Sequence, residues 1–442
     1  MHWVQSHMRE LNFSVSINMW DGSWVGVKMI ENVTSWLRSE FSFIHGNLLT
    51  LIVSWLFLYF TFALVSPFQS PFIEELGAPP VIIGLMGSIG AAMLSLVRIP
   101  GAYIADKYGR KQIIVTMTFS IAFSYLLYVF APDWRFVLVG MIISNLSLIY
   151  QPALQAIHAD SISPERRGIG FAASEVVPNI PTIFAPMVAG FLVETLGLVP
   201  GMRIVFAIVF FCCMAAAMVR LFFLKETILE PKKISFGEMK GAFTESLGAI
   251  VEAWRSMSTS LKFLTAAFLV SAFEEPMFRW FLALYVHDVV KISNFDWGLV
   301  NTLSTAVFII LGLPLGKLVD KIPRKKAIIS SYFIFIPANI LFIISGNFAQ
   351  LLMVFVMYAA GWCLIGPAYQ ALQADMIPRE KRGRIMGTIG TLNVMATIPA
   401  SALAGVLYSV NPAYPFAFII FSGIVVSLII LIAVKEPKTR EK

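Results

Sequence analysis

Residues 101–112 read GAYIADKYGRKQ, and residues 316–326 read GKLVDKIPRKK, so that Asp106 and Arg110 recur 214 positions later as Asp320 and Arg324. A second pair of segments agrees with the first. PALQAIHADSISPERRG at 152–168 returns as PAYQALQADMIPREKRG at 367–383, at an offset of 215. Two separate matches at nearly the same offset predict an internal duplication rather than a chance similarity.

The composition indicates what has been duplicated. Of 442 residues, 58% are hydrophobic and only 13% are charged, and the mean hydropathy is +0.78. A soluble domain has about a quarter of its residues charged. Because about 20 apolar residues cross the hydrocarbon core of a bilayer as a helix, the chain is long enough for many spans. We therefore expect a polytopic membrane protein.

Twelve apolar stretches are separated by short polar breaks, and the first six map onto the last six at the repeat offset; for example, GLMGS at 84–88 corresponds to GLVNT at 298–302. The stretches are 47–72, 80–104, 112–131, 135–158, 169–194, 202–224, 262–286, 297–319, 327–346, 349–373, 385–409 and 414–434. The expected fold is all-α, with two pseudo-symmetric bundles of six membrane helices. The expected segments are a lead (1–45), the first bundle (46–225), a central loop (226–261), the second bundle (262–434) and a tail (435–442).

Charge predicts the orientation. Alternate connections and the tail hold 23 lysines and arginines, whereas the intervening connections hold three, namely Arg135, Arg203 and Lys291. This bias places the basic connections and both termini in the cytoplasm of a cell-membrane protein. The net charge of +7 is then explained by topology. Since no basic stripe with interleaved aromatic residues follows a soluble domain, we expect no nucleic-acid partner.

Two segments lie outside the repeat. In the central loop, apolar residues at helical spacing predict a helix that lies on the inner leaflet or tethers the two bundles: Phe243, Leu247, Ile250, Val251 and Trp254. The lead lacks the features of a signal peptide. We expect its first 28 residues to be poorly ordered, or untranslated if synthesis begins at Met29.

The loop after the second span carries a family signature. Asp106, Lys107, Gly109, Arg110 and Lys111 resemble the G-x-x-x-D-R/K-x-G-R-R/K pattern of the major facilitator superfamily, and the resemblance extends over 47–434. There are departures, because the leading glycine is Ala102 here and the second copy has Pro323 in place of its later glycine. The resemblance implies a secondary transporter that works by rocker-switch alternating access.

In that mechanism, the charged loops lock the outward-facing state across the two halves and separate as the halves rock. The candidate latch residues are Asp106, Gly109, Arg110, Lys111, Glu165, Arg167, Asp320, Arg324, Glu380 and Arg382. An exposed ion pair contributes about 0–1 kcal/mol, which suits a latch that opens in every cycle. The alternative is that the basic residues only set the topology, but this does not explain why the acidic residues recur among them.

Ionisable residues inside the spans are the next candidates, because each is costly in hydrocarbon and usually faces a cavity or a partner. In the seventh span, Glu274 lies about 18 Å from Lys262 along the helix, near the membrane midplane. Glu275 and Arg279 can pair at i,i+4, and Pro276 between them favours a kink. Glu274 therefore becomes the candidate for binding a proton or a cationic substrate, with Glu275 as second choice; the alternative is a neutral acid bonded to another helix.

Further polar candidates lie in other spans. Arg98 and Glu175 have similar depth and opposite charge, and Glu175 could instead meet Lys317. Neutral amides follow the repeat in the fourth and tenth spans and could bind substrate or join helices: Asn145, Gln151, Gln155, Gln370 and Gln373. His158 is interpreted as an interfacial histidine with a backbone partner.

The substrate class is the least defined expectation. APMVAG at 185–190 resembles a degraded G-P-x-x-G-G element of proton-coupled drug antiporters, although no arginine occupies residues 136–165. We therefore expect proton-coupled export of amphipathic or drug-like compounds by a monomer, ahead of uptake of a sugar or organic acid. A non-transporting receptor on the same fold is the contrasting class. No phosphate-binding loop or catalytic constellation is present, so neither ATP, another cofactor, a metal nor an enzymatic activity is expected. Cys212, Cys213 and Cys363 are interpreted as packing residues within spans.

Overall fold

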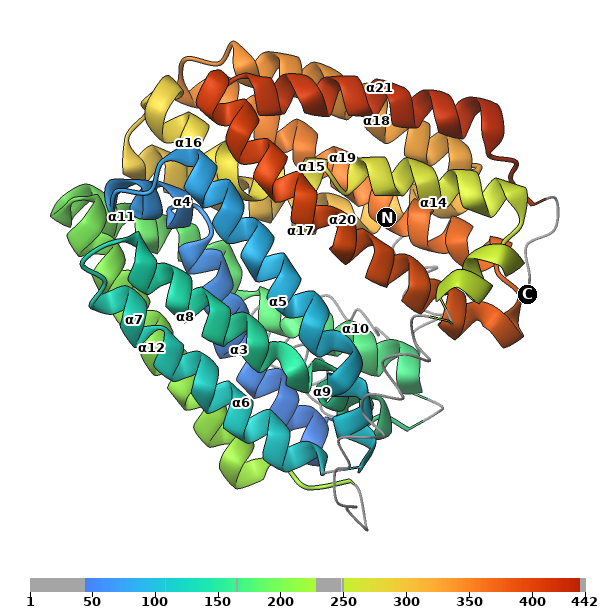
Figure 1. The fold of residues 1–442 in the computed structure, drawn as a ribbon, viewed down its shortest axis with the longest axis horizontal. Helices are drawn as coiled ribbons and strands as arrows, with labels where there is room; N and C mark the ends of the chain where they lie inside the picture. Colours follow the sequence, from blue (N-terminus) through green and yellow to red (C-terminus); the bar gives the residue numbers. More distant parts are fainter. Residues whose placement is uncertain (1–43, 108, 164–165, 228–247, 249, 438–442) are drawn as a thin grey trace, which may run out of the picture. The chain divides into compact units, whose positions relative to one another are not determined.

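The fold is taken from a computed structural model that describes residues 44–107, 109–163, 166–227, 248 and 250–437. Within these ranges the chain is helical and contains no strand (Figure 1). The described residues from Gly46 onward belong to one compact unit. The helices fall in two sets in chain order, and the division of the chain into two bundles stays a prediction.

The first set covers the first six predicted spans. Its helices are α3 (Gly46–Val65), α4 (Gln69–Glu75), α5 (Pro80–Lys107), α6 (Arg110–Ser124), α7 (Leu126–Val129), α8 (Trp134–Ser147), α9 (Gln151–Asp160), α10 (Arg167–Asn179), α11 (Ala185–Leu196) and α12 (Leu198–Phe223). Short 3-10 turns at Leu148–Tyr150 and Pro181–Ile183 join α8 to α9 and α10 to α11. The fourth and fifth spans thus bend near Pro152 and Pro181, where proline removes a helical N–H.

The second set covers the last six predicted spans. Its helices are α14 (Thr259–Ser271), α15 (Glu274–Pro276), α16 (Leu282–Tyr285), α17 (Asn294–Lys321), α18 (Arg324–Ile343), α19 (Phe348–Met376), α20 (Arg382–Val410) and α21 (Tyr414–Ala433). Eleven of the twelve expected spans are long apolar helices in the described part of the chain. The all-α polytopic fold is confirmed.

The seventh span differs from a continuous helix. Its predicted residues 262–286 run through α14 and α15, a π-helical turn at Met277–Phe281 and α16, and a second π-helical turn, Val286–Val290, begins where the predicted span ends. Pro276 lacks the N–H that an α-helix would need, and the wider turn follows directly. The kink expected at this proline is therefore a change of helix type.

Four glycines bring the two helix sets into close contact at one end of the molecule. A Cβ on Gly84 of α5 would lie 2.5 Å from the Ser401 carbonyl oxygen on α20 and 2.8 Å from Gly405 Cα. A Cβ on Gly298 of α17 would lie 2.5 Å from the Pro186 carbonyl oxygen and 3.1 Å from Gly190 Cα on α11. Such distances leave room for hydrogen only, so backbone packs on backbone here. The two contacts are related by the sequence repeat.

We call this end the glycine end and the other, at connections 105–112, 317–326 and 375–384, the basic-loop end. At the glycine end, Trp297 Nε1 donates to the Pro67 carbonyl oxygen at 2.7 Å, and Asn294 N donates to Glu194 Oε2 at 2.8 Å. Both bonds join the two sets. Toward the basic-loop end of α17, a Cβ on Gly312 or Gly316 would meet nothing within 4 Å.

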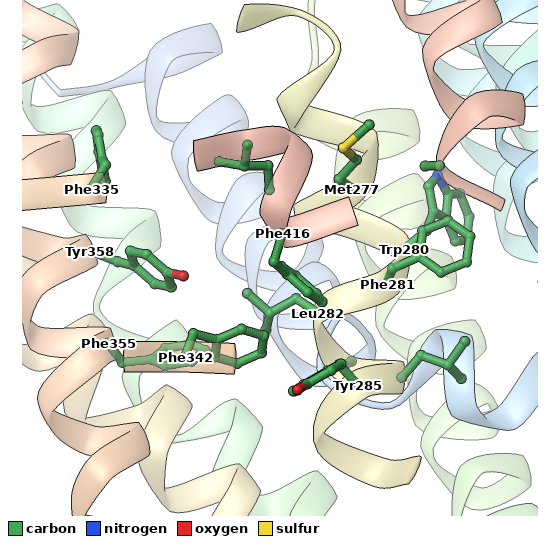
Figure 2. Close-up of a cluster of buried hydrophobic side chains, with 14 of the residues drawn as sticks. Met277, Trp280, Phe281, Leu282, Tyr285, Phe335, Phe342, Phe355, Tyr358 and Phe416 are labelled. Carbon is green, nitrogen blue, oxygen red and sulfur yellow. The ribbon is translucent and has the colours of Figure 1, made fainter. Parts of the chain in front are cut away.

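Aromatic side chains fill the core around the broken seventh span. Figure 2 shows Phe281, Tyr285, Phe342 and Phe416 in one buried group. The Phe342 and Phe416 rings lie 4.7 Å apart, and Tyr285 donates its hydroxyl to the Ile343 carbonyl oxygen at 2.9 Å. These contacts hold the π-helical segments in place through ring packing, which adds to the burial of apolar area.

Several sequence predictions lie outside the described residues: the lead 1–43, most of the central loop (228–247) and Glu165. The described end of the loop, residues 250–256, is helical. Ala253 and Met257 are buried in the apolar core, whereas Val251 is 53% exposed. Glu252 and Arg384 form an ion pair that attaches this segment to α20. The choice between an inner-leaflet helix and a tether of the two bundles stays a prediction.

Candidate functional site

A cavity of about 880 Å³ lies beside the broken seventh span. Most of its wall comes from the second helix set; α3 supplies Phe62, and the turn after α3 supplies Ser66 and Pro67. The polar lining comprises Glu274, Glu275, Arg279, Asn301, Asn339, Asn393, Ser271, Tyr332, Tyr369 and Thr397. Its volume falls in the range of sites for drug-sized molecules, about 300–1,000 Å³.

The three charged candidates of the seventh span all line this cavity. Glu274 accepts a hydrogen bond from Ser422 Oγ on α21 at 2.7 Å, a partner that the sequence did not indicate. Glu275 Oε1 lies 3.6 Å from Arg279 Nη1, and these side chains remain 53% and 55% exposed. Among the described residues the partly buried Glu274 carboxyl thus bonds one neutral side chain, while the exposed Glu275–Arg279 ion pair can exchange partners with a ligand. Their roles in transport stay predictions.

Aromatic rings form much of the remaining wall. Phe268 stacks on Tyr369 with ring centroids 3.4 Å apart, and Phe335 meets Trp362 edge-on at 5.4 Å. The Phe278 ring, which also lines the cavity, meets the Tyr358 ring edge-on with centroids 5.2 Å apart. Flat, apolar surfaces of this kind bind hydrophobic and cationic groups through area burial and ring electrostatics.

The amide candidates separate into two groups. In the second set, Gln373 is buried and donates to Tyr369 Oη at 2.8 Å, which orients a ring of the cavity wall, while Gln370 is exposed. In the first set, Asn145 donates to the Met141 carbonyl oxygen of its own helix at 2.8 Å, and Gln151 and Gln155 are exposed. None of these five lines the cavity. Asn301, Asn339 and Asn393 do, although the repeat did not single them out.

Arg98 and Glu175 are both exposed and neither lines the cavity. Arg98 Nη2 would lie 3.4 Å from a Cβ on Gly390 of α20, so it points toward the second set. Among the described residues, no ion pair joins Glu175 to Arg98 or to Lys317. His158 hydrogen-bonds the Ser174 hydroxyl at 2.8 Å rather than a backbone group.

The first candidate latch loop is joined to its own helix set. Arg110 Nη1 lies 2.5 Å from Asp160 Oδ2 and 3.1 Å from Thr227 Oγ1. Lys111 N donates to Glu226 Oε2 at 2.9 Å. Gly109 adopts φ +102°, a left-handed conformation that explains the glycine of the signature. The side chains of Asp106 and Arg167 are outside the described part.

The second latch loop repeats the carboxylate cap, whereas its arginine pairs with an aspartate one helical turn earlier. Arg324 lies 3.3 Å from Asp320 and also donates to the Val319 carbonyl oxygen, and its backbone N donates to Glu436 Oε1 at 2.8 Å. Arg382 donates to the Ala374 carbonyl oxygen at 2.8 Å, and Glu380 is exposed. A carboxylate after the sixth and twelfth spans thus caps the start of α6 and of α18. The repeated Lys-Glu at 225–226 and 435–436 could have revealed this pair.

Arg220 is a buried cation that the sequence reading missed. Its side chain is 0% exposed within α12. Nη1 donates to Thr118 Oγ1 at 2.8 Å, Nε donates to Ser54 Oγ at 3.1 Å, and the guanidinium lies 5.6 Å from the Tyr150 ring. Nη2 has no hydrogen-bond partner among the described residues. Neutral hydroxyls and a ring therefore hold this charge inside the first helix set.

Comparison with known proteins agrees with this architecture. The model of the Major Facilitator Superfamily matches residues 51–293 and 266–442. The chain is 25% identical over 356 residues to the "Multi-drug resistance efflux pump PmrA" of Streptococcus pneumoniae, covering 78% of this chain and 85% of that protein. It is 23% identical over 392 residues to the "Multidrug resistance protein MdtG" of Salmonella typhi, covering 85% and 92%. The crystal structure of the nucleoside transporter NupG matches with a TM-score of 0.69 at 12% identity, covering 89% and 100%.

The chain belongs to the Major Facilitator Superfamily, as its repeated loops predicted. It is a multi-pass membrane transporter rather than an enzyme. The family takes small molecules as substrates.

Proposed function

We propose that this protein exports amphipathic, preferably cationic, compounds from the cell in exchange for protons. The observation that carries the proposal is the aromatic cavity with the exposed Glu275–Arg279 pair and the partly buried Glu274 in one wall. An organic cation with a flat apolar body could cover the rings and replace Arg279 beside Glu275. The names of the PmrA and MdtG relatives support drug export over metabolite uptake.

The proposed orientation places the basic-loop end and both termini in the cytoplasm of the cell membrane, following the charge bias of the connections. The bonds that Arg110, Lys111 and Arg324 make to described residues stay within their own helix set. At the glycine end the sets touch. Both features fit an inward-facing state in which the cytoplasmic latch has separated. We propose that the monomer is the transporting unit.

Flux of tetraphenylphosphonium into proteoliposomes tests the substrate class and the coupling together. Vesicles that are acidic inside should accumulate the cation, because protons leaving the lumen would drive it inward. Glu275→Gln removes a charge-assisted contact of about 1.5–3 kcal/mol. The KM should therefore rise about 10- to 150-fold, since 1.4 kcal/mol is a factor of ten.

Glu274→Gln tests proton exchange separately. It should leave binding of the cation measurable but abolish the dependence of flux on the pH gradient. Glu175→Gln is the matched control, because that carboxylate is exposed and lies outside the cavity. Gradient-driven flux that survives Glu274→Gln would refute the proton role. Unchanged KM in Glu275→Gln would refute the cation site.

A further inference from the structure

Three titratable side chains from the two helix sets meet at the glycine end, outside the membrane spans and away from the substrate cavity. Glu74 lies at the end of α4, and His287 and Asp288 lie in the π-helical turn Val286–Val290. One nitrogen or oxygen atom from each lies within 4.8 Å of the others. Tyr408 of α20 donates its hydroxyl to Asp288 Oδ2 at 2.8 Å. We call these four residues the Glu74–Asp288 cluster.

The Glu74 and Asp288 carboxyls, one from each helix set, thus face each other with little fixed positive charge nearby to offset their repulsion. His287 Nδ1, 3.0 Å from Asp288 Oδ1, is the basic group that acts on both carboxyls. Glu75, exposed on α4, adds negative charge, and the Tyr285 hydroxyl is bonded to a backbone carbonyl. Other charged side chains at this end are engaged elsewhere or exposed: Arg203 on the Ala131 carbonyl oxygen, Arg135 beside Asp133, Glu194 on Asn294, and Lys291.

Contact between the sets at this point brings like charges together unless a proton is bound. Two ionised carboxylates this close repel each other, and one of them is expected to hold a proton when they share a half-buried site. We propose that closure of the glycine end requires proton uptake by the Glu74–Asp288 cluster, so that the helix sets join here at low pH and separate at high pH. This device is distinct from proton exchange at Glu274 and would operate even in a transporter driven by another gradient.

The direction of the effect follows from the closed arrangement. Burial, reinforced by the charge of Asp288, raises the pKa of Glu74 from 4.5 to about 7. The hydrogen bond to Asp288 raises the pKa of His287. Separation would return both groups to water and to their ordinary pKa values. Since both bind protons more tightly in the closed state, closure is favoured as the pH falls and is lost as the pH rises through about 7.

The pH dependence of the closed-to-open ratio can be calculated from the Glu74 carboxyl alone. A pKa of about 7 in the closed state and 4.5 in the open state makes the closed-to-open ratio about 70-fold larger at pH 5 than at pH 8.5. His287 adds to the change in the same direction. A protein with equal populations of the two states at pH 7 would therefore be about 97% closed at pH 5 and about one-third closed at pH 8.5.

The distance between the two helix sets measures this directly, without transport. Arg135→Cys on α8 and Ser409→Cys on α20 are exposed positions for spin labels, one in each set near this end. Cys212, Cys213 and Cys363 are first replaced by alanine. Double electron–electron resonance on protein in lipid nanodiscs at pH 5 and 8.5 should give a short distance at pH 5 and a growing long-distance fraction at pH 8.5.

Variants assign the response to the cluster. Glu74→Gln keeps a hydrogen-bonding amide but removes the titration, so the short distance should persist at both pH values. Asp288→Asn should act likewise and covers the case that the first variant does not fold. Glu75→Gln, the adjacent exposed carboxylate, should keep the full response. The proposal is overturned if the labelled parent protein shows no shift or the opposite shift, or if Glu74→Gln and Asp288→Asn both respond as Glu75→Gln does.

Discussion

Alanine at Gly298 should push the glycine end apart. The added Cβ would lie 2.5 Å from the Pro186 carbonyl oxygen and 3.1 Å from Gly190 Cα. Ordinary contacts of a Cβ begin near 3.4 Å, so α11 and α17 must separate by nearly 1 Å where both surfaces are backbone. Overpacking of this kind costs about 1–3 kcal/mol. Because the cost falls on the state in which the sets touch, that state should lose about 5- to 150-fold in population.

The spin-label pair on α8 and α20 reports this change as a gain of long distances at constant pH. Gly312→Ala is the matched control on the same helix, since its Cβ would meet nothing within 4 Å. Both substitutions gain the same helix propensity, about 0.5–1 kcal/mol, which cancels in the comparison. Gly84→Ala, the repeat-related change on α5, should behave as Gly298→Ala does. Identical distance distributions for Gly298→Ala and Gly312→Ala would show that the close contact does not control the equilibrium.

Two further predictions each concern one hydrogen bond within a helix set. Thr118→Val removes the acceptor beside the buried Arg220 guanidinium and should cost about 1–3 kcal/mol, seen as a lower Tm in detergent; the exposed Thr116→Val should keep the parent Tm, and equal values would contradict the role of the hydroxyl. Glu436→Gln weakens the charged cap at the start of α18, worth about 0.5–2 kcal/mol, and should speed hydrogen exchange of the first α18 amides. Glu380→Gln, at an exposed carboxylate in the connection between α19 and α20, should leave that exchange unchanged.

The predicted spans agree with the helices because their signals are local. A run of apolar residues about 20 long must satisfy its backbone groups internally, so it forms a helix in the membrane. The repeat of Asp106 and Arg110 likewise needed only the order of residues. The seventh span shows the limit of this reasoning. Its length predicts one continuous helix like the other spans, yet Pro276 and the packing of its aromatic residues divide it into α and π turns.

Residues of the candidate site were found from sequence where charge made them conspicuous. Glu274, Glu275 and Arg279 line the cavity, and the first-set amides chosen from the repeat do not. Periodicity places a side chain on a helix face but cannot tell which face meets a cavity. Asn301 and Asn393 were overlooked for that reason. Arg220 was overlooked as well, because a single arginine near the end of a span resembles an ordinary topogenic charge.

The amino-acid sequence by itself determined the class of the protein: a duplicated, twelve-span chain of the Major Facilitator Superfamily with its charged loops at one end. These features depend on composition, span length and short motifs, which act through local physics. Only the tertiary structure decided that Ser422 binds Glu274, that four glycines bring backbone against backbone, and that Glu74 faces Asp288. Each of these contacts joins residues more than 100 positions apart, and helix packing rather than sequence order sets which residues meet.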